Sequence, residues 1–518
     1  MTPAVEAQAP DSVSATIWTG FAMMCVGMFM AILDVQVVAT SLPTIQQALG
    51  IAQDQMSWIQ TAYLIAEIIA IPLTGFFTRV LTMRGLFVLA VAIFTLASIG
   101  CAMSGGFASL IAFRVLQGFS GGTLIPAVFS AVFLLFPFRL QTLATVIAGV
   151  LAVMAPTLGP VVGGWITSTY SWRWLFLINV LPGLIAAAGA ARCLPRDRPA
   201  FDQACDLDVV SLGLGAVALA ALEIAIKEAP KRGWTSPLAA GLLALCLISA
   251  IVFVARTLRA AHPVVDLRTF RDRNFSVGCL LSFMLGASLF GSVYLMPVFL
   301  AYVREHDALA IGKIMLVTGA AQLVTAPLAT GLVRRCDDRL LTAAGFLLFA
   351  AGLALSAGQT RTTDFAEMFW PQILRGAAIM FCILPPTQLA LSHLAKDAIA
   401  DASGLFNLMR NLGGAIGIAV IDTVIYSRLP EHARALSDRL AGGDLNTAKL
   451  LGIPPEAFGP ALLEPDKQAM LARLIDRQAF VQAINDAWGL VAVATLAALV
   501  VLPLARRSRK RDAAASHG

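Results

Sequence analysis

Long runs of apolar residues, separated by short polar or Pro- and Gly-rich breaks, fill most of the 518-residue chain. A helix needs about 20 apolar residues to cross a bilayer, and each run has about that length or more. The pattern therefore predicts an all-α polytopic membrane protein with fourteen transmembrane helices. They are expected at about 17–42, 57–77, 85–104, 107–133, 141–166, 173–192, 208–228, 236–255, 275–300, 309–333, 340–358, 368–392, 400–427 and 486–505.

The composition agrees with this interpretation and narrows the function. Hydrophobic residues make up 58% of the chain and charged residues 13%, with a mean hydropathy of +0.79, whereas soluble domains average about 25% charged residues. This excludes a soluble enzyme on a membrane anchor. The net charge of +6 comes from cations in short loops, which argues against nucleic-acid binding. Cysteines and histidines show no metal-ligand or catalytic spacing, so we expect no cofactor and no catalysis.

Lys and Arg residues are distributed unevenly among the short loops. With the amino terminus in the cytoplasm, twenty of them lie in cytoplasmic loops and six in the opposite short loops. The positive-inside rule then places both termini in the cytoplasm. Residues 1–16 form one cytoplasmic tail and 506–518 a basic one. The remaining outer segment, 428–485, is long, and its stretches Glu431–Ala441 and Pro465–Asn485 predict short amphipathic helices.

The chain contains an internal repeat. Segment Glu67–Arg79 resembles segment Gln322–Arg335 in the order of its apolar, Pro and Gly positions. We therefore expect an amino-terminal six-helix bundle, 17–192, and a carboxy-terminal one, 275–505, which includes the outer segment. Two joining helices in 208–255 connect them. Parallel repeats with a substrate path between them are a transporter architecture.

The two copies of the repeat differ in charge. Ionisable residues inside the bilayer are costly and usually serve ion or proton movement. Their concentration in the first bundle suggests that it handles protons, while the second bundle shapes the substrate cavity. Asp34, Glu67 and Arg114 correspond to the neutral residues Ser288, Gln322 and Gln372.

Several motifs resemble those of one membrane protein family. Leu33–Pro43 is similar to its first-span signature, Arg114–Gly118 to its fourth-span motif and Ala155–Trp165 to its fifth-span antiporter motif. Pro263–Phe275 and Trp370–Gln372 are similar to segments around its spans 9 and 12. In order and spacing, the chain resembles the major facilitator superfamily, specifically the 14-span drug:proton antiporters of EmrB and QacA type.

This resemblance implies a set of partners. The coupling ion is a proton, and the substrates are small hydrophobic or amphipathic molecules. The outer segment 428–485 also looks EmrB-like, which implies a periplasmic adaptor of the membrane-fusion type in the cell envelope. Through that adaptor, an inner-membrane pump would discharge into an outer-membrane channel.

The loop between spans 2 and 3 departs from the superfamily pattern. That pattern has an Asp four residues after its first Gly and another Gly three residues later, but here Gly75 is followed by Arg79 and Thr82. The usual acidic lock is therefore missing. The remaining basic residues, Arg79 and Arg84, are expected to meet helix ends or anionic lipid.

Asp34 and Arg114 share a depth in the membrane, about 9 and 10 Å below the outer ends of their spans. Since an unpaired charge there is costly, we expect them to pair. The pair is either a proton-exchange element or a fixed structural ion pair. Glu67, about 15 Å into its span, is either a proton or substrate site or a neutral, hydrogen-bonded carboxyl group.

Further polar and small residues complete the candidate site. For Arg410 and Asp422, helix packing and solvation are the structural alternatives. Glu223 has Lys227 one turn away and is expected to form a structural pair with it. Residues of the substrate cavity or gate are expected at Gln117, Gln322, Gln372, Arg375, Asn407, Arg410, Asn411 and Asp422. Residues for close packing and kinking in the antiporter motif are Pro156, Gly159, Pro160, Gly163 and Gly164.

Together these features predict a proton-coupled multidrug efflux antiporter of the inner membrane, working by alternating access with Asp34 on the proton path. A dedicated exporter of one metabolite or siderophore would use the same motifs. A non-transporting receptor or scaffold, holding a partner through 428–485, is the more distant alternative. Charges at mid-bilayer favour transport.

Overall fold

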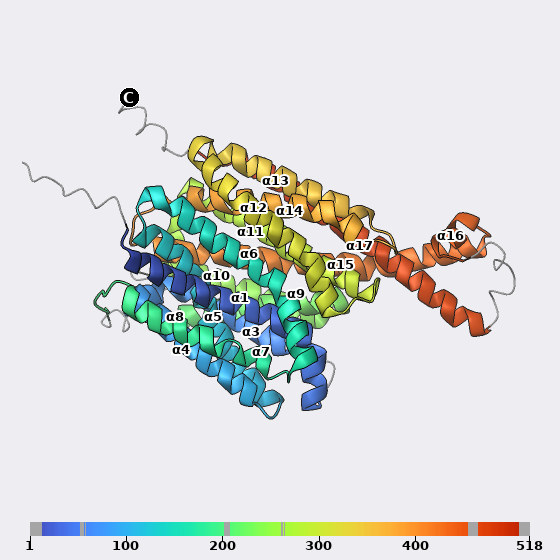
Figure 1. Ribbon diagram of the computed structural model, residues 1–518, viewed down its shortest axis with the longest axis horizontal. Coiled ribbons are helices and arrows are strands. Elements are labelled where there is room, and N and C mark those ends of the chain that lie inside the picture. Colours follow the sequence, from blue (N-terminus) through green and yellow to red (C-terminus); the bar gives the residue numbers. More distant parts are fainter. Residues whose placement is uncertain are drawn as a thin grey trace, which may run out of the picture.

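The computed structural model describes residues 13–51, 56, 58–200, 208–260, 263, 265–453 and 465–506, and its described part is built from helices (Figure 1). The amino-terminal group of helices, from α1 to α8, is followed by α9 and α10 and then by the carboxy-terminal group, from α11 to α17. The helices are α1 (Ala15–Leu49), α3 (Trp58–Ala70), η1 (Ile71–Leu73), α4 (Thr74–Met103), α5 (Phe107–Leu135), α6 (Phe138–Thr169), α7 (Trp174–Leu177), α8 (Val180–Cys193), α9 (Val209–Arg232), α10 (Pro237–Arg259), η3 (Leu267–Arg271), α11 (Arg273–Tyr302), α12 (Ala308–Arg335), α13 (Asp338–Leu355), η4 (Ser356–Gly358), α14 (Phe365–Leu391), α15 (Ile399–Ala441), α16 (Leu445–Leu450), α17 (Pro465–Val501) and η7 (Leu502–Leu504).

Thirteen helices among the described residues are long and apolar enough to cross a membrane. One of them, Trp58–Met103, has 46 residues and combines α3, η1 and α4, which at 1.5 Å per residue would be about 69 Å long. The backbone at Thr82, with φ 68° and ψ 162°, breaks this helix inside α4. The stretch therefore holds two predicted spans, and the all-α polytopic fold class is confirmed.

The helices pack into two groups around two main apolar cores, and each core also takes in some residues of the other group. In the amino-terminal group α1 packs along α6 and α8, and α5 packs along α3 and α4. In the carboxy-terminal group α11 packs along α15, and α14 packs along α12 and α13. The groups meet where α12 lies against α6 and where α15 lies against α4 and α5.

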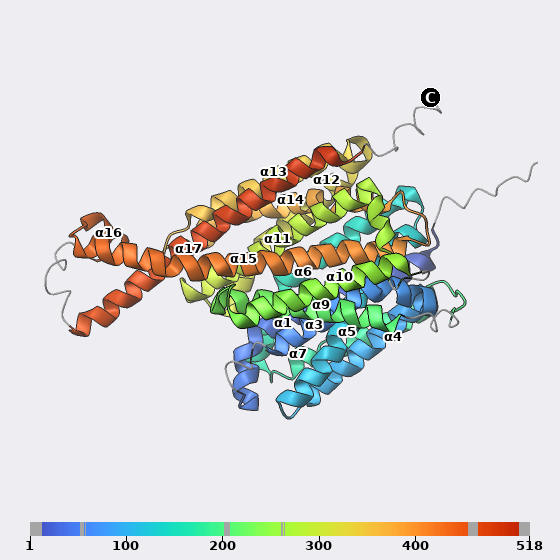
Figure 2. The same ribbon diagram turned by 180° about the vertical axis from the view of Figure 1, so that it is seen from behind.

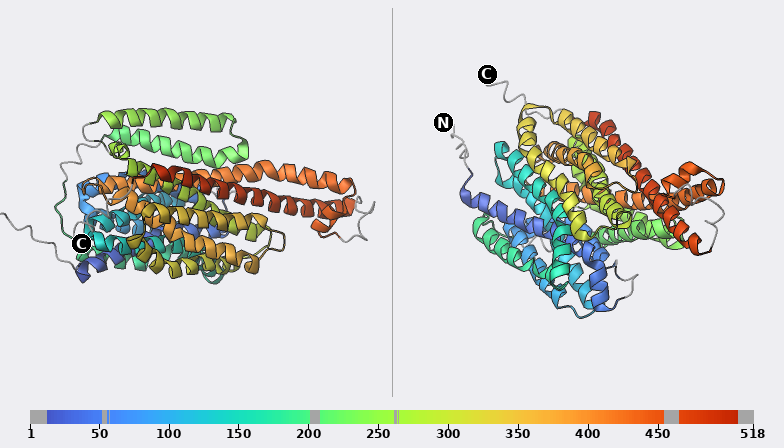
Figure 3. Two further views of the ribbon diagram at one scale, coloured as in Figure 1. Left: turned by 90° about the horizontal axis from the view of Figure 1, so that it is seen from above. Right: turned by 45° about the vertical axis from the view of Figure 1, so that its right-hand side comes forward.

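Helices α9 and α10 form a separate pair on one side of the bundle. The pair lies towards the viewer in Figure 2 and along the top in the left view of Figure 3. α9 packs against α10, α3 and α15, so it bridges the two groups. α10 exposes large apolar side chains such as Leu247 and Ile248. In a membrane protein such a surface faces lipid.

α15 and α17 extend beyond the bundle and carry α16 between them (Figure 1). The two amphipathic stretches predicted in 428–485 are continuous with the neighbouring spans, because α15 runs on through Pro430 and α17 starts at Pro465. Leu436, Leu451 and other apolar residues form a small separate core there. We call this the hairpin end; the start of α1 and the end of α17 lie at the opposite, termini end.

Candidate functional site

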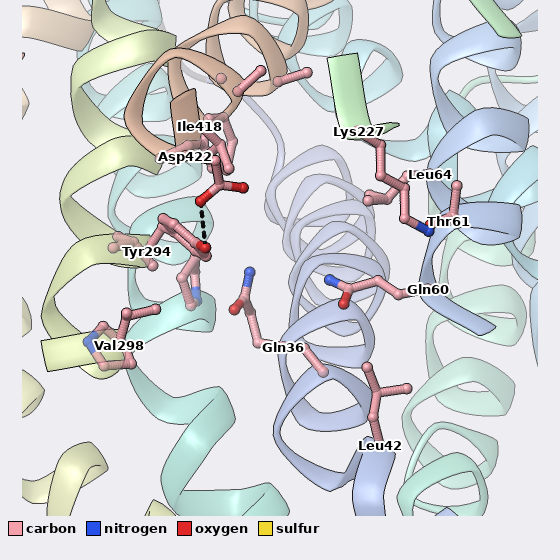
Figure 4. A pocket seen from close by; sticks show the side chains of 18 of the residues that line it. Gln36, Leu42, Gln60, Thr61, Leu64, Lys227, Tyr294, Val298, Ile418 and Asp422 are labelled. Carbon is pink, nitrogen blue, oxygen red and sulfur yellow. Dashed lines mark hydrogen bonds between the residues drawn. The ribbon is translucent and has the colours of Figure 1, made fainter. Parts of the chain in front are cut away.

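A cavity of about 740 Å³ lies between the two groups of helices. Its walls come from α1, α3, α6, α9, α11, α12 and α15. Most of the wall is apolar, but Gln36 and Gln60 project into it between Lys227 on one side and the Tyr294–Asp422 pair on the other (Figure 4). The Tyr294 hydroxyl donates to Asp422 Oδ1 at 2.7 Å. This is an apolar chamber with a few convergent polar groups, as expected for a small-molecule site.

Asp34 and Arg114 form the ion pair expected from their depth. Arg114 Nη1 lies 2.6 Å from Asp34 Oδ2, and both side chains are completely buried. Arg114 also donates from Nε to the Ile59 carbonyl at 3.1 Å and lies over the ring of Tyr63, 4.3 Å from its centroid. The pair lies behind the cavity wall, since neither residue lines the cavity.

The polar cluster around Asp34 is larger than the sequence indicated. Gln117, one turn after Arg114, accepts from Arg114 at 2.7 Å and donates to Asp34 Oδ1 at 3.0 Å and to Ser98 at 2.8 Å. Asn179, just before α8, donates to Asp34 Oδ1 at 2.7 Å. Asn179 and Ser98 were not expected at the site, although Asn179 is a polar interruption of an apolar run. The carboxylate is thus held by three donors.

Two further carboxylates reach the cavity from different helices. Glu67 on α3 and Glu223 on α9 both line it, and their charges repel each other electrostatically. Glu223 and Lys227 both line the cavity, and their structural pairing stays a prediction. Lys227 also donates to the Thr61 hydroxyl and lies 5.0 Å from the ring centroid of Trp58, because α9 packs against α3.

The candidate residues of the carboxy-terminal group separate into two sets. Asn411 and Asp422 on α15 line the cavity. The others are buried in helix contacts outside the cavity. Gln322 donates to the Gly149 carbonyl at 3.4 Å, and Gln372 accepts from Thr318 at 3.1 Å. Asn407 donates to the Ser403 carbonyl at 2.9 Å and accepts from Arg410, and Arg375 lies beside Met296.

The antiporter motif lies on α6, which stays helical through both of its prolines. Pro156 and Pro160 line the cavity. Gly159 lies against α1, where an added Cβ would overlap the Gln36 side chain. Gly163 is buried and Gly164 half-buried. The small residues therefore permit close contact of α6 with α1, which leaves the functional role of the motif a prediction.

The loop between spans 2 and 3 does carry an acidic partner, but from the other group of helices. Arg79 forms an ion pair with Asp401, in the first turn of α15. Gly75 lies against the same carboxyl group, and an added Cβ would overlap it. Arg84 is half-buried. Thr82 stands where the pattern has Gly and adopts a backbone conformation that is almost exclusive to Gly.

Comparison with known proteins assigns the fold to a family. The sequence profile described as Major Facilitator Superfamily matches residues 24–418. The chain belongs to this superfamily. Among its members, the chain is 38% identical over 409 residues to the colistin resistance protein EmrB of Acinetobacter baumannii, covering 79% of this chain and 80% of that protein.

A second relative is the multidrug export protein EmrB of Escherichia coli. It is 28% identical to this chain over 460 residues, which cover 88% of this chain and 89% of that protein. The crystal structure of the human organic anion transporter MFSD10 shares the fold, with a TM-score of 0.60 and 14% identity. The match covers 96% of this chain and 100% of that one. The EmrB-type resemblance seen in the motifs is confirmed. The relatives of this multi-pass membrane protein are transporters.

Proposed function

We propose that the protein is a proton-coupled multidrug efflux antiporter that exports hydrophobic or amphipathic compounds across the inner membrane, with both termini in the cytoplasm. Relatives named for multidrug export and for colistin resistance support the substrate class. The observation that carries the coupling is the buried Asp34–Arg114 ion pair beside a large cavity between the two groups of helices. Buried ionisable pairs at this depth serve ion movement in membrane proteins.

Protonation of Asp34 is the coupling step. When Asp34 gains a proton, the ion pair is lost, and Arg114 keeps its bonds to Gln117 and to the Ile59 carbonyl. Ile59 precedes Gln60 and Thr61, which line the cavity. A change at the pair therefore reaches the cavity wall through α3. This gives two states with different proton affinity, as antiport requires.

The structure corresponds to an outward-facing state in this proposal. At the termini end the two groups are joined by the Arg79–Asp401 ion pair and by the Ser403 hydroxyl, which donates to the Pro126 carbonyl at 2.9 Å. The cavity wall extends in the other direction to Tyr302 and His306, at and after the end of α11. The inward-facing state then needs the termini-end contacts to separate.

The hairpin end supplies the docking site for the adaptor, and through it the link to an outer-membrane channel. The extended parts of α15 and α17 hold α16 away from the bundle (Figure 1), and Leu445 and Leu450 are exposed on α16. Deleting Glu431–Ile484 should therefore weaken adaptor binding more than transport in vesicles. Equal loss of both would contradict this division.

The proposal is tested in acid-loaded proteoliposomes by adding lipophilic cations, weak acids and neutral drugs and recording proton release. We expect release with several unrelated compounds for the wild type and none for Asp34→Asn. Ser288→Ala, at the corresponding position of the other group, is the control and should retain release. Release by Asp34→Asn at the wild-type rate would refute the proton role. Release with none of the compounds would indicate a dedicated metabolite exporter or a non-transporter.

A further inference from the structure

Arg375, in the middle of α14, is a buried cation with no carboxylate partner among the residues that the structure describes. Its side chain is 4% exposed. Nη2 lies 3.6 Å from the thioether sulfur of Met296, the guanidinium lies 5.0 Å from the ring centroid of Trp488, and Nε has no hydrogen-bond partner. Arg114, which is completely buried, is paired with Asp34.

These contacts satisfy only part of the guanidinium. A thioether is a weak acceptor, and an aromatic face attracts a cation without neutralising it. A buried charge is stable only when it is paired and its donors are bonded. Nearby donors are also unused: Gln372 Nε2, one turn before Arg375, and Trp488 Nε1 have no partner. Among the described residues, the surroundings of Arg375 therefore offer unused donors and no carboxylate.

A small cavity of about 20 Å³ adjoins Arg375. Three hydroxyl groups line it together with the guanidinium, those of Thr157, Ser292 and Thr318. Their protons now bond the Val153 and Leu289 carbonyls and Gln372 Oε1, and a hydroxyl can rotate to serve another acceptor. The volume suits one water-sized particle, such as a carboxylate oxygen or a halide ion.

The small cavity and the main cavity share two wall residues, Val293 and Met315. The two cavities are therefore adjacent, with Val293 and Met315 in the wall between them. Since Met is flexible, it can move aside for a ligand group. An anionic head could lie at Arg375 while an apolar tail remained in the main cavity.

We propose that Arg375 anchors a binding site for one small anionic group, completed by the hydroxyls of Ser292, Thr318 and Thr157. The anion comes either from an inorganic halide or from the carboxylate of an amphipathic compound that lies in the main cavity. The second source rests on the proposed function, whereas binding of the anion does not. The site differs from the Asp34–Arg114 pair because its counter-charge comes from a ligand.

The test measures binding to the purified full-length protein in phosphatidylcholine nanodiscs, and needs no transport. Decanoate is titrated against decanol, and chloride against gluconate, with Trp488 fluorescence as the readout and Trp488→Phe to assign the signal. We expect saturable binding of decanoate or of chloride to the wild type, and a dissociation constant at least about tenfold higher in Arg375→Gln. Binding of decanoate without binding of chloride would identify the anion as a substrate carboxylate. Binding of chloride without binding of decanoate would identify it as an inorganic ion.

Two further variants keep the test decisive. Arg410→Gln removes another buried guanidinium, one that lines neither cavity, and should bind the anion like the wild type. Thr318→Val keeps the charge and removes one hydroxyl, so it should weaken binding about threefold even if Arg375→Gln fails to fold. Equal response to decanoate and decanol together with no effect of chloride, or equal loss in Arg375→Gln and Arg410→Gln, overturns the proposal.

Discussion

Arg79 on α4 and Asp401 in the first turn of α15 form an ion pair that joins the two groups of helices at the termini end. The loop of Arg79 lacks the acidic residue of its superfamily pattern, and Asp401 provides one from 322 positions away in the chain. A carboxylate in the first turn of a helix is also stabilised by the helix dipole. The basic loop at this end thus has an acidic partner, which comes from the opposite group.

Breaking this pair should favour separation of the two groups at the termini end. We expect Asp401→Asn to reduce efflux about tenfold, because the closed state loses its ion pair. In a cysteine-free background, Ser403→Cys should be protected from a membrane-impermeant maleimide and become reactive when Asp401→Asn is added. Ser403 is buried against the Pro126 carbonyl. Unchanged labelling would show that the ion pair does not hold this end closed.

Thr82 is strained, and replacing it with Gly should stabilise the protein. A non-Gly residue in this backbone region costs about 1–3 kcal/mol, while Thr82→Gly loses only the hydrogen bond from Gly85 N–H to Thr82 Oγ1 at 3.2 Å. We expect a net gain of about 1 kcal/mol, measured by thermal unfolding in detergent.

The control is Thr78→Gly, four residues earlier in the same helix. Thr78 is helical and donates to the Thr74 carbonyl at 2.7 Å. A Gly there should cost about 0.5–1 kcal/mol. If both variants unfold at lower temperature than the wild type, the strain at Thr82 is refuted.

Asn179 should tune the pH dependence of transport through Asp34. Removing its side chain deprives the Asp34 carboxylate of one of three donors, which favours the protonated form. A hydrogen bond to a charged group is worth about 1.5–3 kcal/mol. We therefore expect half-maximal transport by Asn179→Ala to move upward by about one pH unit.

The comparison variant is Asn485→Ala, which removes hydrogen bonds to the Gln359 backbone far from the ion pair. It should leave the pH profile in place. A profile of Asn179→Ala that coincides with the wild type, at reduced rate, would assign Asn179 a purely structural role.

Asp364, at the start of α14, links stability to acid pH. Partial burial opposes its ionisation, but hydrogen bonds from Arg304 and His306 outweigh this and lower the pKa of Asp364 from 3.8 to about 2. Because the folded pKa is the lower one, the contribution is complete above pH 3.8 and disappears as the pH falls towards 2.

Asp364→Asn keeps a side chain that can cap the helix and removes the charge. We expect it to cost about 1 kcal/mol at pH 7, and its melting temperature should converge on that of the wild type between about pH 4 and pH 2. Asp307→Asn, which changes an N-cap bonded to Ala310 N–H, is the control. A gap between Asp364→Asn and the wild type that stays constant on acidification would contradict the assignment.

Glu223 should influence which compounds are transported. It and Glu67 place two carboxylates on the cavity wall, and removing one charge weakens the attraction for organic cations. We expect kcat/KM of Glu223→Gln to fall about tenfold for lipophilic cations and to stay constant for neutral compounds. The control is Glu228→Gln. Glu228 is on the same helix but pairs with Arg232 outside the cavity, so this variant should leave kcat/KM unchanged for both classes of compound.

The fold could be predicted from the sequence because the bilayer leaves little choice. Only helices satisfy the backbone of a single span in lipid, so the apolar runs indicate their number and place. The pairing of Asp34 with Arg114 followed from the constant rise of a helix, which fixes the depth of both residues. The order and spacing of the motifs indicated the family, which local physical chemistry alone does not identify.

The remaining parts of the site depend on contacts between distant segments. Asp401 reaches Arg79 only because α15 packs against α4. Asn179 reaches Asp34 because it directly precedes α8, which packs along α1. Lys227 contacts Thr61 because α9 packs on α3, and helix spacing alone does not indicate this partner. Such choices depend on tertiary geometry, which the pattern of one segment does not contain.

The position of α9 determines how a lipophilic compound can leave the membrane. α9 stands between α3 and α15, with Glu223 and Lys227 towards the cavity and α10 on its outer side. A compound dissolved among the acyl chains on this side meets two helices before it meets the chamber. In this state it therefore has to enter by another face of the bundle, or wait until α9 parts from one of its neighbours. For such a compound, the pair α9–α10 closes one lateral route from the bilayer to the chamber.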